Sequence, residues 1–300
     1  MINKRKVVIG TWPLSGDFGD VSLSQIEKSI QLCLDLDFRE FDTAPSYGNG
    51  FIEHCLGRII ANRNDIVINT KVGNLPFRGK DFSCDALETS LNESLKRLRI
   101  DKIGTLFLHN PRSDLKEPQK VIDWMQNKKE EGIISFMGLS VAKNFDYDPQ
   151  FIQAFDVIQN DANLLYLKGM RKIKKYQGIK FVARSPLASG ILSGKLSANS
   201  TFSNRDHRSS WLKGERLNSL VKRCNIISKT TDIPLSSLAK RFLLNQPDIS
   251  QVIFGVKSPD HVLEIDVDVK APPIDQKLTD QLIKLHDEDF SLVNEEKLGY

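Results

Sequence analysis

Four side chains that can take part in acid–base chemistry stand at or just after the ends of strand-like segments in this chain. Asp42, Lys71 and His109 each end such a segment, and Tyr47 lies in the loop that follows Asp42. In a parallel barrel the carboxyl ends of all strands lie on one face, where active sites form. A carboxylate, an ammonium, an imidazole and a phenol would therefore meet on that face, which predicts a catalytic site.

The segments that position these residues alternate between strand-like and helix-like patterns. We expect strands at Val7–Thr11, Phe38–Asp42, Ile66–Lys71, Ile103–His109, Ile133–Leu139, Phe155–Gln159, Lys180–Ser185 and Ser250–Phe254. We expect helices at Leu23–Leu36, Gly50–Ala61, Asp85–Leu98, Pro118–Glu131, Pro149–Ala154, Leu164–Tyr176, Glu215–Lys229, Leu235–Asn245 and Pro259–Ile265. This unbroken series of strands, each followed by a helical segment, predicts a closed (β/α)8 TIM barrel that forms one domain over residues 1–300.

The alternative architecture is an open doubly wound sheet. Such a sheet usually carries a Gly-x-Gly-x-x-Gly turn after its first strand. Here the first strand leads into Gly10-Thr11-Trp12-Pro13-Leu14, which lacks that turn, and the chain also lacks a Walker phosphate-binding motif. The sequence therefore favours the barrel.

Three local signals mark boundaries within this pattern. Ser22 and Gln25 have the spacing of a capping box that opens the first helix, and Gly132 falls where the fourth helix would be capped. Residues 185–214 form an unusually long connection without a clear helical period. Loops of this length are usually functional, and we expect this one to cover the cofactor as a lid.

Composition excludes several classes of protein. The 42 basic and 38 acidic residues leave a net charge of only +4, without a basic patch interleaved with aromatic residues, so we expect no nucleic-acid partner. No segment approaches the roughly 20 apolar residues of a membrane span, and the basic start of the chain is not followed by a signal-like apolar stretch. The four cysteines are far apart and lack metal-ligand spacing, which predicts reduced thiols, no metal site and a cytoplasmic protein.

Taken in order, several segments resemble the aldo-keto reductase family, in particular its bacterial NADP-dependent members. These segments are Asp42–Gly48 with Glu53, Leu56 and Gly57; Val67–Lys71; Ser90–Leu98 with Leu106–His109; Ser185–Lys195; and Phe202–Arg208. Each piece is a weak signal, but their order and spacing together are specific. The resemblance extends from about Gly10 to Glu264, and it implies the barrel fold and carbonyl reduction.

The resemblance also implies a role for each of the four acid–base residues. A nicotinamide cofactor would supply hydride, because no side chain can. Tyr47 would donate the proton, with its pKa, ordinarily about 10, lowered by the ammonium of Lys71. Asp42 would pair with Lys71 and keep it charged, and His109 would hydrogen-bond the carbonyl oxygen. The alternatives are a structural ion pair between Asp42 and Lys71 and a histidine buried in the core.

Cofactor-binding residues follow from the same resemblance. Ser140 and Gln159 would bond the nicotinamide carboxamide, and Gly10, Thr11, Trp12 and Asp42 would lie beside the cofactor. Ser185, Leu187 and Ser189 would hold the diphosphate of the cofactor. Gly255, Lys257 and Ser258 would hold the adenosine 2′-phosphate, and Glu264 would contact the adenine. Lysine and serine before a helix N-terminus suit a phosphate. The cofactor expected is therefore NADPH, with NADH as an alternative.

Four positions depart from the family's common pattern. Val141 replaces an asparagine that helps to bind the carboxamide, and Arg184 replaces a tyrosine that stacks on the nicotinamide ring. His261 and Ile265 stand near the adenosine, where Arg or Gln and then Asn are frequent. The planar guanidinium of Arg184 can stack as well, but it would repel the positively charged oxidised ring. We therefore expect Arg184 to favour binding of the reduced cofactor.

The sequence says less about the substrate. Trp12, Phe18, Phe77, Asn110 and Trp211 are candidate pocket walls, and the short polar tail Asn294–Tyr300 suggests an open site for small aldehydes or sugar-like carbonyls. Two other functions stay open. One is a cofactor-binding sensor of the channel β-subunit type, and the other is an NAD-linked sugar dehydrogenase. No feature of the sequence indicates an oligomeric state.

Overall fold

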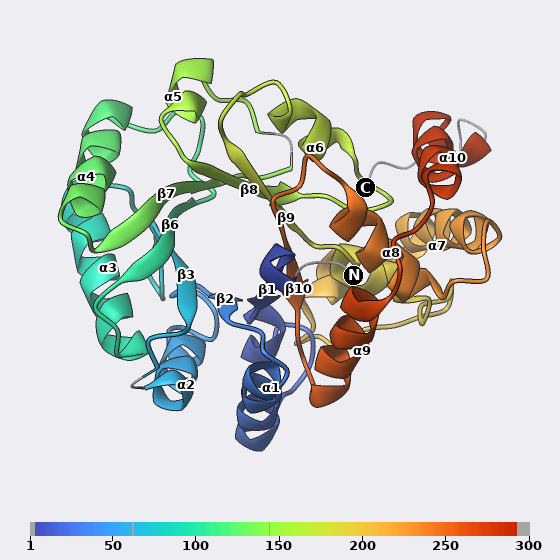
Figure 1. The fold of residues 1–300 in the computed structure, drawn as a ribbon, viewed down its shortest axis with the longest axis horizontal. Helices are drawn as coiled ribbons and strands as arrows, with labels where there is room; N and C mark the ends of the chain where they lie inside the picture. Colours follow the sequence, from blue (N-terminus) through green and yellow to red (C-terminus); the bar gives the residue numbers. More distant parts are fainter. Residues whose placement is uncertain (1–3, 62, 144, 293–300) are drawn as a thin grey trace.

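The protein folds around a ring of parallel strands. The computed structural model describes residues 4–61, 63–143 and 145–292. Within these ranges, eight strands close into a barrel in chain order, and the last strand pairs with the first (Figure 1). They are β1 (Val7–Gly10), β2 (Glu40–Asp42), β3 (Val67–Val72), β6 (Ile103–His109), β7 (Ile134–Ser140), β8 (Val157–Asp161), β9 (Lys180–Arg184) and β10 (Gln251–Gly255). Each predicted strand overlaps one of these, so the predicted (β/α)8 TIM barrel is confirmed.

Helices surround the barrel (Figure 1). They are α1 (Leu23–Asp35), α2 (Phe51–Ile60), α3 (Cys84–Leu98), α4 (Pro118–Glu130), α5 (Pro149–Gln153), α6 (Lys168–Ile173), α7 (Gly214–Ser228), α8 (Leu235–Asn245), α9 (Pro259–Lys270) and α10 (Gln276–Asp287). Short 3-10 helices are η1 (Lys4–Lys6), η2 (Trp12–Ser15), η3 (Ala188–Ser193), η4 (His207–Ser210) and η5 (Asp289–Ser291). None of the helices in the described ranges combines the length and apolar character needed to cross a bilayer.

The local boundary signals act as expected. The Ser22 hydroxyl accepts a hydrogen bond from the Gln25 backbone, and the Gln25 side chain accepts one from the Ser22 backbone, which completes the capping box. Gly132 adopts a φ of 77° just after α4, and the next N–H, of Ile133, bonds the Lys128 carbonyl at 3.1 Å. This is the left-handed cap that glycine provides most easily. Both predictions are confirmed.

The structure also contains elements that the sequence pattern did not predict. The hairpin of β4 (Asn74–Leu75) and β5 (Gly79–Lys80) follows the third strand of the barrel, and α10 begins after Asp275, whose carboxylate accepts a hydrogen bond from the Leu278 backbone. The connection of residues 185–214 contains η3 and η4 and is therefore not free of helical turns. The predicted polar tail Asn294–Tyr300 lies outside the described residues.

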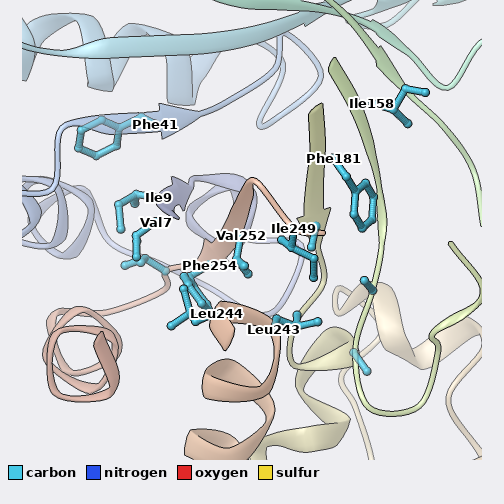
Figure 2. Packing of buried hydrophobic residues seen from close by; sticks show 14 of the residues in the cluster. Val7, Ile9, Phe41, Ile158, Phe181, Leu243, Leu244, Ile249, Val252 and Phe254 are labelled. Atoms are coloured by element: carbon cyan, nitrogen blue, oxygen red, sulfur yellow. The ribbon is translucent and has the colours of Figure 1, made fainter. Parts of the chain in front are cut away.

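Two layers of apolar packing hold the barrel. Val7 and Ile9 of β1 belong to the large apolar cluster between the strands and the helices. Figure 2 shows both residues in this cluster, together with Leu243 and Leu244 of α8. Val8, between them in sequence, belongs to a second cluster with Phe107, Val157, Val182 and Ile253 of four other strands. Because successive side chains of a strand point to opposite faces, this second cluster fills the barrel interior. The barrel is thus a packed core that holds the strand ends rigidly.

Candidate active site

The carboxyl ends of the strands surround one cavity. Its volume is about 870 Å³, within the range typical of small-molecule sites. Strand pairing places His109 beside Ser140 and Ser140 beside Gln159, and it pairs Gly10 with both Asp42 and Gly255. Residues that are far apart in the chain therefore meet because they occupy equivalent positions on neighbouring strands.

Asp42 and Lys71 form a buried ion pair. Lys71 Nζ lies 2.6 Å from Asp42 Oδ1 and donates a second hydrogen bond of 2.8 Å to the Thr43 carbonyl. The lysine is only 1% exposed. Burial by itself would lower the pKa of Lys71, but the charge of Asp42 and the hydrogen bonds to Asp42 and Tyr47 help to outweigh burial and hold the pKa above its ordinary value. Lys71 therefore keeps its proton at neutral pH.

Tyr47 lies against this pair. Lys71 Nζ is 4.9 Å from the centre of the Tyr47 ring, and the His109 ring packs edge-on against Tyr47 at 6.3 Å between ring centres. Burial raises the pKa of Tyr47, and the opposing effect of Lys71 does not cancel that rise. The prediction that Lys71 brings this pKa below its ordinary value is therefore wrong for this structure, because loss of water around the phenol has the larger effect.

His109 completes the group as a neutral imidazole. Burial is the main cause that holds its pKa well below the ordinary value, and the nearby charges of Lys71, Arg184 and Lys80 lower it further. His109 lines the cavity, and its Nδ1 is buried without a hydrogen-bond partner among the described residues. A neutral imidazole can donate one hydrogen bond and accept another.

A chain of hydrogen bonds extends from this group to the next strands. Gln159 Nε2 donates to Asp42 Oδ2 at 2.9 Å, and Ser140 Oγ donates to Gln159 Oε1 at 3.1 Å. Arg184 Nη1 in turn donates to Ser140 Oγ at 2.6 Å. Of the two residues that the resemblance assigned to the carboxamide, Gln159 thus bonds Asp42 directly and Ser140 is connected to Asp42 through Gln159.

Arg184 is also held by a second set of contacts. Arg184 Nη2 lies 3.3 Å from Asp161 Oδ2 and donates to the Val141 carbonyl at 2.7 Å. Burial alone would raise the pKa of Asp161, yet Arg184 and its other partners lower it below the ordinary value. Asp161 therefore balances part of the Arg184 charge. That Arg184 favours the reduced cofactor stays a prediction.

The far end of the cavity lies beside β10 and the start of α9. The Lys257 backbone N–H donates to His261 Nδ1 at 3.3 Å, and Lys257 Nζ donates to the Phe18 carbonyl at 2.7 Å. Burial lowers the pKa of His261, and Lys195 and Lys240 add to that effect while Glu264 opposes it. The predicted phosphate site is therefore rich in cations and lies at a helix N-terminus.

The long connection packs against the loop that follows β1. The His207 backbone N–H donates to the Asp17 carbonyl at 2.7 Å, and the Trp12 indole donates to Asp17 Oδ2 at 2.5 Å. The rings of Trp12 and His207 lie 5.5 Å apart and those of Phe18 and His207 lie 6.2 Å apart. Residues from both loops line the cavity. Coverage of a cofactor by residues 185–214 stays a prediction.

Most of the predicted site residues share this cavity. Its lining includes Gly10, Trp12, Asp42, Tyr47, His109, Gln159, Arg184, Ser185, Leu187, Ser189, Gly255, Lys257, His261 and Glu264. The other predicted residues, which are Thr11, Lys71, Ser140 and Ser258, do not line it. Thr11, Lys71 and Ser140 are buried behind the lining, and Thr11 bonds the Asp42 carbonyl through its hydroxyl.

The pocket-wall predictions have a mixed outcome. Trp12, Phe18, Asn110 and Trp211 line the cavity, but Phe77 does not, because it lies in the β4–β5 turn and is 89% exposed. The sequence reasoning missed the charged lining residues Lys143, Asp161 and Arg216, and it named Lys195 and Arg208 only within longer segments. Asp161 follows Gln159 by two positions on the same strand, so strand periodicity could have identified it.

Two residues of the sequence motif around Tyr47 have structural roles. Glu53 is fully buried and accepts hydrogen bonds from the Thr70 hydroxyl at 2.7 Å and from Arg97 Nε at 2.8 Å. A Cβ atom added at Gly57 would lie 2.3 Å from the Arg97 carbonyl oxygen. Glycine therefore allows α2 to approach the end of α3, which fixes the loop that carries Tyr47.

Comparison with known proteins agrees with this geometry. A model of the aldo/keto reductase family matches residues 6–284. The chain belongs to this family. It is therefore an oxidoreductase of a family that uses NAD(P)H and acts on small molecules.

Individual relatives are distant in sequence. The chain is 28% identical to an L-galactose dehydrogenase of Arabidopsis thaliana over 86% of this chain and 82% of the relative. It is 26% identical to a Schizosaccharomyces pombe protein named as a voltage-gated potassium channel subunit beta, over 93% and 88% of the two chains. The fold matches the glycerol dehydrogenase AKR11B4 of Gluconobacter oxydans with a TM-score of 0.79 and 22% identity, covering 95% of this chain and 92% of that one.

Proposed function

We propose that this aldo/keto reductase family member reduces small aldehydes or ketones, including sugar-like carbonyls, with NADPH, and that Tyr47 donates the proton. One observation carries this proposal. A protonated phenol lies against a charged, buried Lys71–Asp42 pair and beside the neutral His109, and Tyr47 and His109 both line the cavity. This set offers a proton donor and a hydrogen-bonding group to a carbonyl oxygen, with a cation buried directly behind the donor.

The described residues fit a nicotinamide dinucleotide. When bound, the nicotinamide would supply the hydride. The amide of Gln159 and the guanidinium of Arg184 line the cavity at the catalytic end, and Ser185, Leu187 and Ser189 offer backbone and hydroxyl groups to a diphosphate. At the other end, the cations of Lys195, Lys257 and Arg208 line the cavity. Cations at that end favour the 2′-phosphate of NADPH over the hydroxyl of NADH.

The proton transfer from Tyr47 depends on its neighbours. The raised pKa keeps the phenol protonated at neutral pH, which is the form a reduction consumes. Once the proton has left, the phenolate lies close to the ammonium of Lys71, which stabilises the new negative charge without reorganisation. Asp42 fixes that ammonium in place. The His109 imidazole, neutral and on the cavity wall, would hydrogen-bond the carbonyl oxygen.

A second candidate function is the oxidation of a sugar with NAD. The relative named L-galactose dehydrogenase favours it. The two candidates differ in the preferred nucleotide and direction, since a sugar dehydrogenase would reduce NAD⁺ faster than it oxidises NADPH. The channel-subunit relative raises the sensor alternative as well. A full set of acid–base residues around the cavity favours an enzyme over a sensor.

The proposed function is tested by following NADPH oxidation with a panel of small aldehydes and sugar carbonyls. Wild-type protein and the Tyr47→Phe variant are compared at matched concentration, with NADPH binding measured for both by fluorescence. We expect turnover by wild type and a loss of about 100-fold or more in kcat for the variant, because one proton-transfer group contributes 10²–10⁴-fold. Equal activity of the two proteins would exclude Tyr47 as the donor. Binding without turnover by either protein would favour the sensor.

A further inference from the structure

Three basic side chains and Asp161 lie together on the cavity wall. Lys143 follows β7, Arg184 ends β9, and Arg216 lies in the first turn of α7; all three line the cavity together with Asp161. They are close enough to act on one another. Burial lowers the pKa of Lys143 to about 8; Asp161 opposes this change, and Arg216 and Arg184 add to it. Lys143 thus lies close to one carboxylate and to two guanidinium groups, and this excess of cations leaves the wall positively charged.

The single carboxylate is already engaged by Arg184. The Arg184 guanidinium pairs with Asp161 and donates hydrogen bonds to the Ser140 hydroxyl and the Val141 carbonyl. Arg216 differs from Arg184 in its partners. Among the described residues, Arg216 has no carboxylate within ion-pair distance, and its Nε is buried without a hydrogen-bond partner. Its guanidinium faces the Trp211 ring at 5.4 Å. A buried charged donor without a partner is costly, so a ligand that supplies negative charge there would be stabilised.

This cluster lies at the catalytic end of the cavity. Lys143 comes three residues after Ser140, which pairs in register with His109 on the neighbouring strand. Arg184, which pairs with Asp161, also lies close enough for its charge to act on His109. The positive wall is therefore placed to contact a substrate whose carbonyl carbon lies near Tyr47 and His109.

We propose, on the basis of the proposed reductase function, that the carbonyl substrate carries an anionic group, a carboxylate or a phosphate, which binds Lys143 and Arg216. A guanidinium offers paired N–H donors that match the oxygens of either group, and an ammonium adds a point charge. Trp211, whose indole N–H is buried without a partner among the described residues, lines the same region. Binding of the anion gives Arg216 the counter-charge that the protein itself does not provide.

Matched pairs of aldehydes test this proposal. 4-Carboxybenzaldehyde is compared with benzaldehyde, and glyceraldehyde 3-phosphate with glyceraldehyde, with NADPH as the reductant. For wild type we expect a kcat/KM that is roughly 10- to 100-fold higher for the anionic member of one pair, as charged hydrogen bonds provide. The pair with the larger ratio identifies the anionic group.

Substitutions of Arg216 and Lys143 test whether these two residues cause the preference for the anionic aldehyde. Arg216→Met and Lys143→Met should each raise KM for the anionic aldehyde about tenfold or more, while kcat/KM for its neutral partner and the Kd for NADPH stay unchanged. Arg216→Lys should restore part of the preference, which also shows that the fold tolerates a change at this position. The control is Lys213→Met, which removes an exposed positive charge three residues away that does not line the cavity.

Two results would overturn the proposal. One is an equal kcat/KM for the charged and neutral members of both pairs. The other is weaker NADPH binding in Arg216→Met and Lys143→Met with no change in the ratio, which would assign these cations to the cofactor. If wild type reduces none of the aldehydes, the reductase proposal fails by itself. The Kd of each aldehyde for the protein with NADP⁺ then decides the anion proposal, and equal values within both pairs would refute it.

Discussion

At the scale of single residues, burial sets the protonation states of the site. Asp42 keeps Lys71 charged although the ammonium is almost fully removed from water. Tyr47 and His109 are shifted toward their neutral forms by the same loss of water. The site therefore combines one fixed ion pair with two neutral hydrogen-bonding groups, an arrangement in which a phenol can serve as a proton donor.

These protonation states predict a pH profile. Reduction needs the protonated phenol, and the pKa of Tyr47 lies above its ordinary 10.0, so activity should be lost only as pH rises through that pKa. For a neutral aldehyde such as benzaldehyde, we expect kcat/KM to vary by no more than about twofold between pH 6 and 9 and to fall above about pH 10. Single-turnover rates across this range provide the measurement. A fall centred near pH 7 or 8 would show that the proton comes from another group.

At the scale of elements, strand register and helix contacts place these side chains. The register brings Ser140 next to both His109 and Gln159, and the loop after β2 carries Tyr47 toward Lys71. That loop ends at α2, which approaches α3 closely at Gly57. Packing at a distance from the cavity therefore contributes to the geometry of the site.

Replacement of Gly57 tests whether the close approach of α2 to α3 stabilises the fold. In Gly57→Ala the new methyl group would overlap the backbone at Arg97 and Leu98, and backbone atoms cannot move aside as a flexible side chain can. We expect a loss of free energy of unfolding of about 1–3 kcal/mol, the usual cost of overpacking. Urea unfolding measures this loss, and Arg58→Ala, at an exposed position of the same helix, is the control. Equal stability of the two variants would mean that α2 and α3 can separate without cost.

At the scale of the whole molecule, one cavity joins the catalytic residues to the start of α9. A ligand that fills its whole length contacts loops after many strands and stabilises the folded state through each of them. The small net charge of +4 conceals this local concentration of cations.

Thermal unfolding in the presence of nucleotides tests the cofactor assignment. At equal concentration NADPH should raise Tm more than NADH, because Lys257 lies at the cavity end proposed for the 2′-phosphate. A ligand at 100 times its Kd adds about 2.7 kcal/mol of stability. In Lys257→Met the two nucleotides should give similar shifts. A larger shift with NADH in wild type would contradict the assignment and favour the NAD-linked dehydrogenase.

The barrel, and the face of it that carries the acid–base residues, could be predicted from the sequence. Apolar periodicity over five to seven residues defines a strand, and the residue that breaks it marks the strand end, so Asp42, Lys71 and His109 could be assigned to one face. The capping box at Ser22 and the glycine at Gly132 are likewise local signals. Such features depend on neighbours in the chain, which a sequence displays directly.

Other properties depend on contacts that the sequence does not display. The pKa of Tyr47 rises because many distant groups exclude water from the phenol, and that effect exceeds the one neighbour, Lys71, that the sequence pointed to. The chain from Asp42 through Gln159 and Ser140 to Arg184 forms because strand register and side-chain rotamers bring four strands together. Arg216 became part of the cavity only when the long connection and α7 packed against the barrel. The sequence thus determined which strand-end residues reach the site. The tertiary structure decided which other side chains line it, together with the protonation states and partners of all of them, because desolvation and long-range contacts arise only when the chain is folded.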